Sequence, residues 1–335
     1  MTRRLLLTLV CVFAFQSIMA YAAAPANPLR KLVNARKAKW QSAKREIAQN
    51  VPAEKIKALI VDGQNNHNWR ATTPVLKDIL EKSGRFSVDV ATAPTKKDKE
   101  ADAEKYKKDL ASFKPDFAQY DVIIGNYNSS ETGDEWSSEA RKAFEEFIKN
   151  GGGYVSYHAA DNSFRNWEEY HKMIGIAGWY RDADTFGKYL YWEDGKAVTS
   201  DEKGRCGHHG PQWAFLIEVR DTSHQITKGL PKEFRHCQDE LYDCLRGPAV
   251  DVSVLATALA PKDKGGRDKH EPMLMAIPYG KGRIFHTTLG HDVPMLKSVS
   301  FIVTFLRGAE WAAIGKVTIP VPDDFPGADK PTFRH

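Results

Sequence analysis

The chain has 335 residues, of which 27% are charged and 42% are hydrophobic, and its formal net charge is +5 at pH 7. This length suits one large α/β domain or two small ones, and no internal repeat points to a repeat architecture. The positive charge is too small and too dispersed to predict a protein that binds nucleic acid.

The first 24 residues are predicted to be a secretory signal peptide. Arg3 and Arg4 precede a short apolar run from Leu5 to Met19, and alanines with the spacing of a cleavage site follow it. A retained membrane anchor is the alternative, but the run is short for a membrane span. We therefore expect an exported protein, periplasmic or extracellular, with no membrane contact after processing.

Residues 25–54 are predicted to form a helical extension in front of the domain. The basic stretch 31–45 places Leu32, Val33 and Trp40 on one face of a helix and leaves its positive charges on a solvated face.

The next residues predict a βαβ unit. Residues 55–63 are a β-branched apolar run typical of a buried parallel strand. A helix follows, with Thr73 as its N-cap, Pro74 at its first position and Gly84 at its end. Residues 86–92 form the second strand, so the pair is expected to be parallel with a right-handed crossover.

Beyond this unit, strands and helices continue to alternate. The highly charged residues 95–109 predict a solvated helix or connector. Further strands are expected at 120–128, 154–158, 213–219, 251–257, 272–280 and 282–288, and further helices at 138–149 and 298–311. The pattern predicts an α/β fold, in which a doubly wound, mostly parallel sheet carries helices on both faces. We expect a single domain over 55–315 and a C-terminal tail over 316–335.

Polar residues gather where the predicted strands end. In a doubly wound sheet, ligands bind outside the carboxyl ends of the strands. The polar residues that follow these ends are Asn65, Asn66 and His67; Asn126 and Tyr127; His158 and Asp161; and His291 and Asp292.

Two of these histidines have competing interpretations. His67 either faces the pocket or belongs to a loop whose asparagines favour turns for local backbone reasons. His158 stands at a sharp turn before two alanines, which would let a following helix pack closely. It could be a general base, a metal ligand or a hydrogen-bonded turn residue.

The irregular middle of the chain adds a histidine pair and a carboxylate. Adjacent histidines rarely both face one site, and we favour His209 over His208. Glu240 is the candidate carboxylate. Covalent catalysis by serine or cysteine is not expected, because the chain has no GxSxG motif and no cysteine at a strand end.

Three cysteines lie in the same region: Cys206, Cys237 and Cys244. In an exported protein one disulfide among them is plausible, with one thiol left over, and the sequence does not choose the pairing. A zinc site built from these cysteines and neighbouring histidines is an alternative, although the spacings fit no common zinc module.

Five segments, taken in order over roughly 55–310, resemble the ThuA-like (trehalose utilisation) family: DGQNNHNWRATTPVLKDILEKSG, GGGYVSYHAADNSF, GHHGPQWAFLIEV, HQITKGLPKEFRHCQDELY and YGKGRIFHTTLGHD. The resemblance implies the class I glutamine amidotransferase-like fold, a flavodoxin-like sheet with helices on both faces. In those amidotransferases a cysteine follows the strand, whereas this chain has His158 there, so glutaminase activity is not expected.

The resemblance also implies a role in carbohydrate catabolism, often beside oxidoreductases that make keto-sugars, and some family members bind a metal. The family's recurring polar positions fall on His67, His158, His209, Glu240 and His291. We therefore expect an exported enzyme that acts on glycosides or oxidised (keto) disaccharides by histidine- or metal-assisted hydrolysis or elimination.

The expected site has three groups of residues. The catalytic residues are His158, His67 and Glu240; the substrate-binding residues are Asn65, Asn66, Asn126, Tyr127, Asp161 and Asp292; and the ligands of a divalent metal such as zinc are His158, His209 and His291. The expected partner is a small-molecule carbohydrate, and a homo-oligomer is left open.

Two other functions compete with this one. The first is a sugar-binding module without chemistry, in which Trp69, Trp167 and Trp179 stack on sugar rings. The second is a structural or interaction role within a larger assembly.

Overall fold

The computed structural model describes residues 54–130, 132–179 and 186–334. The predicted signal peptide, and all but the last residue of the predicted extension, lie outside the described residues. Among the helices of the described chain, none is long and apolar enough to cross a membrane.

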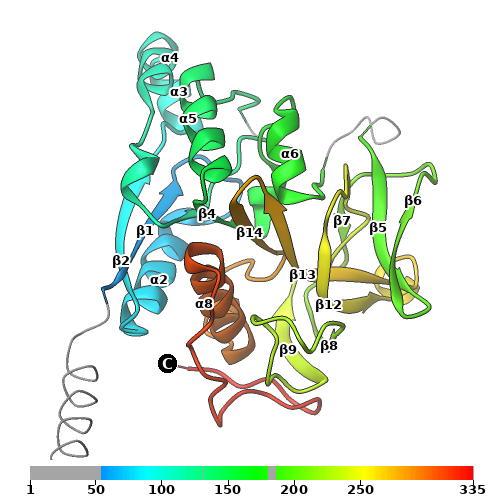
Figure 1. The fold of residues 1–335 in the computed structure, drawn as a ribbon. Coiled ribbons are helices and arrows are strands. Elements are labelled where there is room, and N and C mark those ends of the chain that lie inside the picture. Colours follow the sequence, from blue (N-terminus) through cyan, green and yellow to red (C-terminus); the bar gives the residue numbers. More distant parts are fainter. Residues whose placement is uncertain (1–53, 131, 180–185, 335) are drawn as a thin grey trace, which may run out of the picture. The chain divides into compact units, whose positions relative to one another are not determined.

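A mixed sheet runs through the domain (Figure 1). Its parallel part has the order β2-β1-β3-β4-β14. These strands are β1 (Ile56–Asp62), β2 (Phe86–Thr92), β3 (Val122–Gly125), β4 (Gly153–Tyr157) and β14 (Gly282–Thr287). The predicted α/β class, with mostly parallel core strands, is confirmed.

Four strands extend the sheet beyond β14, each antiparallel to its neighbour. In order these are β13 (Lys269–Tyr279), β12 (Ser253–Ala260), β8 (Trp213–Val219) and β9 (Glu233–Asp239). Direction reverses at every step, so after four reversals β9 runs parallel to β14. The carboxyl end of β9 therefore lies at the same edge of the sheet as the carboxyl ends of the parallel strands.

Shorter strands complete the β structure. The antiparallel β5 (Lys188–Glu193) and β6 (Lys196–Ser200) form a hairpin that joins the sheet where β5 pairs with β13, and β5 also pairs with β11 (Arg246–Gly247). A separate two-stranded ribbon joins β7 (His208–His209) to β10 (Tyr242–Asp243).

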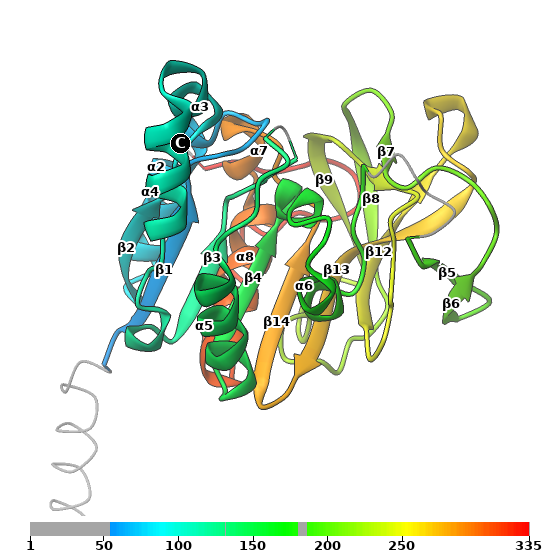
Figure 2. The same ribbon diagram turned by 90° about the horizontal axis from the view of Figure 1, so that it is seen from above.

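Helices cover both faces of the sheet, as Figure 2 shows from above. One core cluster packs α2 (Trp69–Lys82) and α8 (Val299–Ile314) on one face. The other packs α4 (Ala103–Ser112), α5 (Ser138–Lys149) and α6 (Glu168–Ile174) on the opposite face. The remaining helices are α3 (Lys96–Ala101) and α7 (Val293–Leu296). Residues 54–335 make one compact unit.

The sequence explains why α5 and α8 form as they do. In α5, Ala140, Phe144 and Ile148 are buried along one stripe, and the Ser137 hydroxyl accepts from the Ala140 N–H as an N-cap. In α8 nearly every residue is buried, the polar Ser300, Thr304, Arg307 and Glu310 included, and the helix ends at Gly315 with a φ of 68°.

Helix α2 begins earlier than predicted, at Trp69, and Pro74 lies inside it. Thr73 is not its N-cap: the hydroxyls of Thr72 and Thr73 instead accept from Asn126 Nδ2, each at 3.0 Å. Pro74 is the sixth residue of the helix and has no N–H to donate to the preceding turn, so one backbone hydrogen bond of α2 is missing there.

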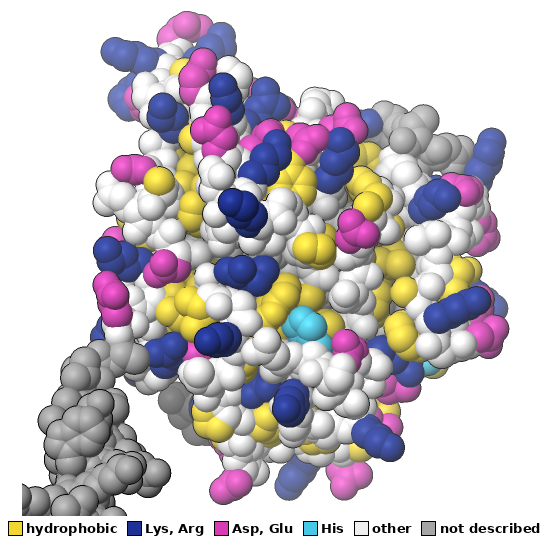
Figure 3. Space-filling view, in the orientation of Figure 1, with side chains coloured by type: hydrophobic (Ala, Val, Ile, Leu, Met, Phe, Trp, Pro, Cys, Tyr) yellow, Lys and Arg dark blue, Asp and Glu magenta, His cyan; other side chains and the backbone are white. Residues whose placement is uncertain are grey.

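The three cysteines of the described chain are free and buried, so the disulfide considered from the sequence does not form. Their surroundings differ, because the thiol of Cys206 contacts Ala177 O while that of Cys237 contacts His236. On the face seen in Figure 3, basic and acidic side chains are interspersed, in line with the dispersed charge of the sequence.

Candidate functional site

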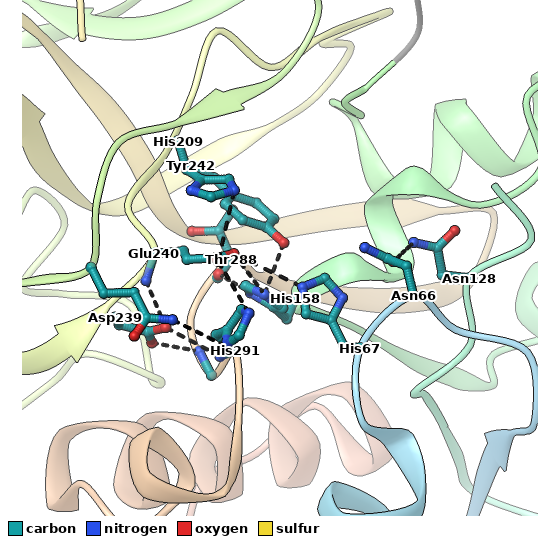
Figure 4. A network of polar contacts seen from close by, with 12 residues as sticks. Asn66, His67, Asn128, His158, His209, Asp239, Glu240, Tyr242, Thr288 and His291 are labelled. Carbon is teal, nitrogen blue, oxygen red and sulfur yellow. Dashed lines mark hydrogen bonds and ion pairs between the residues drawn. The ribbon is translucent and has the colours of Figure 1, made fainter. Parts of the chain in front are cut away.

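Four histidine side chains converge on one carboxylate, that of Glu240 (Figure 4). The Nε2 atoms lie 3.1 Å (His291), 3.7 Å (His158), 3.7 Å (His209) and 3.9 Å (His67) from a carboxylate oxygen of Glu240. The imidazole ring of His67 packs edge-on against those of His158 and His291, with centroids 4.8 and 4.7 Å apart.

The strand directions explain this convergence. His67 follows β1, His158 follows β4, and His291 follows β14 after a short turn, all at the carboxyl edge of the parallel strands. Glu240 directly follows β9, whose carboxyl end reaches the same edge. His209 precedes the antiparallel β8, so it arrives from the amino end of a strand that starts at that edge.

His158 is held tightly at the end of β4. It has a positive φ of 44° and begins a short 3₁₀ helix, η2 (His158–Asn162). Its Nδ1 donates to the carbonyl of Thr288 at 2.7 Å, so the lone pair lies on Nε2. The hydroxyl of Tyr242 donates to this Nε2 at 2.8 Å. Both ring nitrogens are thus engaged in hydrogen bonds.

The tautomers of His67 and His209 are set by neighbouring acceptors. His67 Nδ1 lies 3.3 Å from the side-chain oxygen of Asn65, and His209 Nδ1 lies 2.8 Å from the carbonyl of Gly210. Because an amide or carbonyl oxygen can only accept, each Nδ1 carries the proton. The Nε2 lone pairs therefore face Glu240.

The site stabilises a negative charge on Glu240. Burial alone would raise the pKa of Glu240, but the surrounding imidazoles of His158, His291 and His67 lower that pKa well below the ordinary value. Burial lowers the pKa of His67 to about 4, so this ring is neutral at pH 7. The hydrogen bond to Glu240 raises the pKa of His291.

The donor set fits a divalent metal ion. One nitrogen each from His67 and His291 and one oxygen from Glu240 all lie within 4.8 Å of one another. A tetrahedral zinc ion with bonds of about 2.1 Å separates its ligand atoms by roughly 3.4 Å, so small side-chain shifts would suffice. His209 Nε2, 3.7 Å from Glu240, could supply a fourth ligand.

Amide groups and one indole surround this cluster. Asn66 is exposed and accepts from Asn128 Nδ2 at 2.6 Å. The partly buried Asn65 holds the His67 loop by accepting from the His67 N–H at 2.9 Å. The half-buried ring of Trp179 lies 4.3 Å from the Tyr242 ring and 6.0 Å from the His209 ring.

Comparison with known proteins places the chain in a family. The family model described as ThuA, trehalose utilisation, matches residues 57–312. The chain belongs to this ThuA family. Among solved structures, a ThuA-like protein from Parabacteroides merdae shares 42% identity with a TM-score of 0.78, over 84% of this chain and 98% of that one.

A second ThuA-like protein, from Bacteroides uniformis, is 23% identical with a TM-score of 0.49, over 79% of this chain and 95% of that one. A comparison with curated proteins finds no match.

In this ThuA-family protein, three residues predicted to bind substrate are buried, and that role stays a prediction for each of them. Asn126 is 1% exposed, and its amide bonds Thr72 and Thr73. Tyr127 packs between Trp136 and Phe164 in an aromatic cluster. Asp161 is fully buried, 3.7 Å from His286 Nε2.

Other residues considered from the sequence have structural contacts outside the cluster. His208 turns away from the cluster and bonds Asp243 at 2.9 Å. Asp292, next to His291, caps α7 by accepting from the Val293 N–H at 2.7 Å. Trp167, considered for sugar stacking, is 4% exposed and belongs to the core. The chemical roles of His67, His158, His209, Glu240 and His291 stay predictions.

The sequence did not single out Tyr242, and among the carboxylates near it Glu240 was preferred to Asp239. Tyr242 pairs with His209 in the β7–β10 ribbon, which brings its hydroxyl to His158. Burial raises the pKa of Tyr242 well above its ordinary value, so the phenol stays protonated. Both residues flank Glu240 in DELYD, and that proximity was the only available signal.

Proposed function

We propose that this ThuA-family protein is an exported, metal-assisted enzyme of carbohydrate catabolism. Its substrates would be glycosides or oxidised (keto) disaccharides, cleaved by hydrolysis or elimination. The observation that carries the proposal is the convergence of four imidazoles on the buried carboxylate of Glu240. Such perturbed titratable groups cluster at functional sites more often than in ordinary cores.

His67, Glu240 and His291 would hold the ion, with His209 as a further ligand. When bound, a divalent ion would polarise a carbonyl or hydroxyl oxygen of the sugar. Two of these histidines already present the Nε2 lone pair that metal binding needs, because Asn65 and Gly210 hold the Nδ1 protons. The carboxylate supplies the negative charge that offsets the charge of the ion.

His158 would accept a proton. In a keto-sugar the hydrogen beside the carbonyl is acidified, so its removal expels the glycosidic leaving group. Thr288 fixes the Nδ1 proton of His158 and leaves the Nε2 lone pair facing Tyr242 and Glu240. The Tyr242 hydroxyl orients this nitrogen. When Nε2 takes up the proton, the hydroxyl would turn to accept a hydrogen bond from the new Nε2–H.

The surroundings of the cluster support a carbohydrate ligand. Trp179 offers a partly exposed apolar ring beside His209, and Asn66 offers an exposed amide that can bind hydroxyl groups. The same features would also serve a sugar-binding module, which is therefore the second candidate function.

The test combines elemental analysis with turnover of a panel of glycosides and 3-keto-glycosides. We expect about one divalent ion per chain, and activity that Glu240→Gln removes. His208→Gln is the matched control, because this neighbouring histidine bonds Asp243 outside the cluster. Protein that binds no divalent ion and cleaves no member of the panel would refute the enzyme. Calorimetric binding with recovery of intact sugar would favour the binding module.

Export is a separate part of the proposal and rests on the N-terminal sequence pattern. Mass spectrometry of the chain recovered from a periplasmic or secreted fraction should find a mature N-terminus near Ala22 to Ala24. Recovery of the chain from the cytoplasm with residues 1–24 still attached would contradict export.

A further inference from the structure

Asp239 lies directly behind the cluster, and its carboxylate is fully buried. Its Oδ1 accepts from the N–H groups of Glu240 at 2.8 Å and His291 at 3.1 Å. Its Oδ2 accepts from the N–H of Gly290 at 2.7 Å and contacts Nε2 of His236 at 2.8 Å. One side chain therefore fixes the backbone of Glu240 and His291, which form the shortest of the four carboxylate–imidazole contacts in the site.

A second pair anchors Asp239 itself. His236 is fully buried, and its other ring nitrogen lies 2.8 Å from the hydroxyl of Ser300 in the first turn of α8. Ser300 in turn bonds Ser298, the N-cap residue of that helix, at 2.8 Å. The chain of contacts joins the end of β9, the turn after β14 and the start of α8.

The turn held by Asp239 has little freedom to move. Gly290 has a φ of 103°, and a Cβ there would lie 2.6 Å from the ring of Phe301 and 2.7 Å from that of Tyr157. The Tyr157 hydroxyl also donates to the Gly290 carbonyl. The turn that carries His291 is thus fixed by Asp239 on one side and by Tyr157 and Phe301 on the other.

We propose that Asp239 is a positioning residue, which sets the distance between the Glu240 carboxylate and the His291 imidazole. A carboxylate is required because it offers about four lone-pair directions, and here four donors occupy them. Asparagine has the same shape but presents N–H groups on one side, so at least one backbone donor would face another donor. The inference deepens the proposed function and rests on it for the identity of the ion.

A metal ion at Asp239 is the competing interpretation, because donor atoms of His236, Cys237 and Asp239 also lie within 4.8 Å of one another. The Asp239 oxygens, however, already have hydrogen-bond partners. A proton between His236 and Asp239 satisfies both groups without an ion.

The test measures the Zn²⁺ affinity of the chelator-treated full-length protein by competition titration. For Asp239→Asn we expect a 10- to 100-fold loss of affinity, the range typical for residues that orient metal ligands. The matched control is Glu310→Gln. Glu310 is equally buried and accepts from two backbone N–H groups, at Thr318 and Ile319, but these belong to the C-terminal segment rather than to the site.

We expect Glu310→Gln to lower the unfolding midpoint and leave the Zn²⁺ affinity unchanged. If Asp239→Asn does not fold, Ser300→Ala is the second variant. This variant removes the hydrogen bond between Ser300 and His236 and leaves the Asp239 carboxylate unchanged. It should weaken Zn²⁺ binding by about fivefold, the effect of one neutral hydrogen bond. Zn²⁺ affinity unchanged in the folded variants, or lowered equally by Glu310→Gln, would overturn the proposal.

Crystal structures of the metal-free wild type and of Asp239→Asn keep the two proposals separable. If the wild type binds no Zn²⁺, the proposed function fails, but a displaced turn at residues 289–292 in the variant would still support positioning. An undisplaced turn would overturn positioning. Two bound ions per wild-type chain, falling to one in Asp239→Asn, would instead favour the metal at Asp239.

Discussion

Replacing His67 by glutamine tests whether this ring is kept neutral in the metal-free protein. Burial lowers the pKa of His67 to about 4 from an ordinary value of 6.5. Between these two values the unfolded chain binds a proton that the folded chain does not. The contribution of His67 therefore reduces stability as the pH falls from 6.5 to 4, and it is absent at pH 7.

The shift corresponds to about 2 kcal/mol of lost stability at pH 5, where the unfolded chain is mostly protonated at this position. His67→Gln cannot take up the proton. Its free energy of unfolding should therefore fall by about 2 kcal/mol less than that of the wild type between pH 7 and pH 5. For a domain of this size that is roughly 3 to 4 °C in Tm.

The assay is denaturant unfolding of chelator-treated protein at pH 7 and pH 5. His171→Gln is a positive control on α6, because burial also lowers the pKa of His171 to about 4. His67→Gln could keep the full acid sensitivity of the wild type while His171→Gln loses part of it. That result would refute the conclusion that the His67 ring is neutral in the folded protein.

Three further predictions follow from the site. Chelation of the wild type should abolish turnover reversibly, whereas Glu240→Gln should lose Zn²⁺ binding, with Zn²⁺ titration as the check. Tyr242→Phe removes only the hydroxyl that bonds His158, so kcat should fall roughly 10²-fold with little change in KM. Trp179→Ala should raise KM more than it lowers kcat, because the ring would bind substrate without entering the proton transfer.

Much of the fold could be predicted from local pattern. The bounds of β2, α5 and β8 agree with the sequence patterns, since each has a clean apolar period and distinct ends. Strand β9 was missed because Glu233, Arg235 and Gln238 obscure its alternation, although Phe234 and His236 on the same strand are buried. The residues of β9 occupy both exposed and buried positions in the structure. Their sequence alone resembles that of a loop.

The site was predictable only where strand ends mark it. His67, His158 and His291 follow parallel strands, so the edge rule brings them together. The same rule placed Asn126 and Asp161 in the pocket, but it specifies an edge and not a side-chain direction. Asn126 turns inward because two threonine hydroxyls in α2 bind its amide. The position of Glu240 depends on four reversals of strand direction, which no local pattern records.

The backbone of His158 offers a last test, because it separates the needs of the site from those of the fold. Its φ of 44° lies in a region that costs an L-residue about 1–2 kcal/mol and costs glycine little. His158→Ala and His158→Gly both remove the bonds to Thr288 and Tyr242, so turnover should disappear in both.

The two variants should differ in stability. Glycine should be the more stable by about 1 kcal/mol, since only alanine keeps the strain in the folded state, although the more flexible unfolded glycine chain offsets part of this gain. Denaturant unfolding checks the order. An alanine variant that is clearly the more stable would mean that the positive φ is not kept once the imidazole is gone. In that case the hydrogen bonds from His158 to Thr288 and Tyr242 would be the cause of the positive φ. The backbone of the turn alone would not place the imidazole in the site.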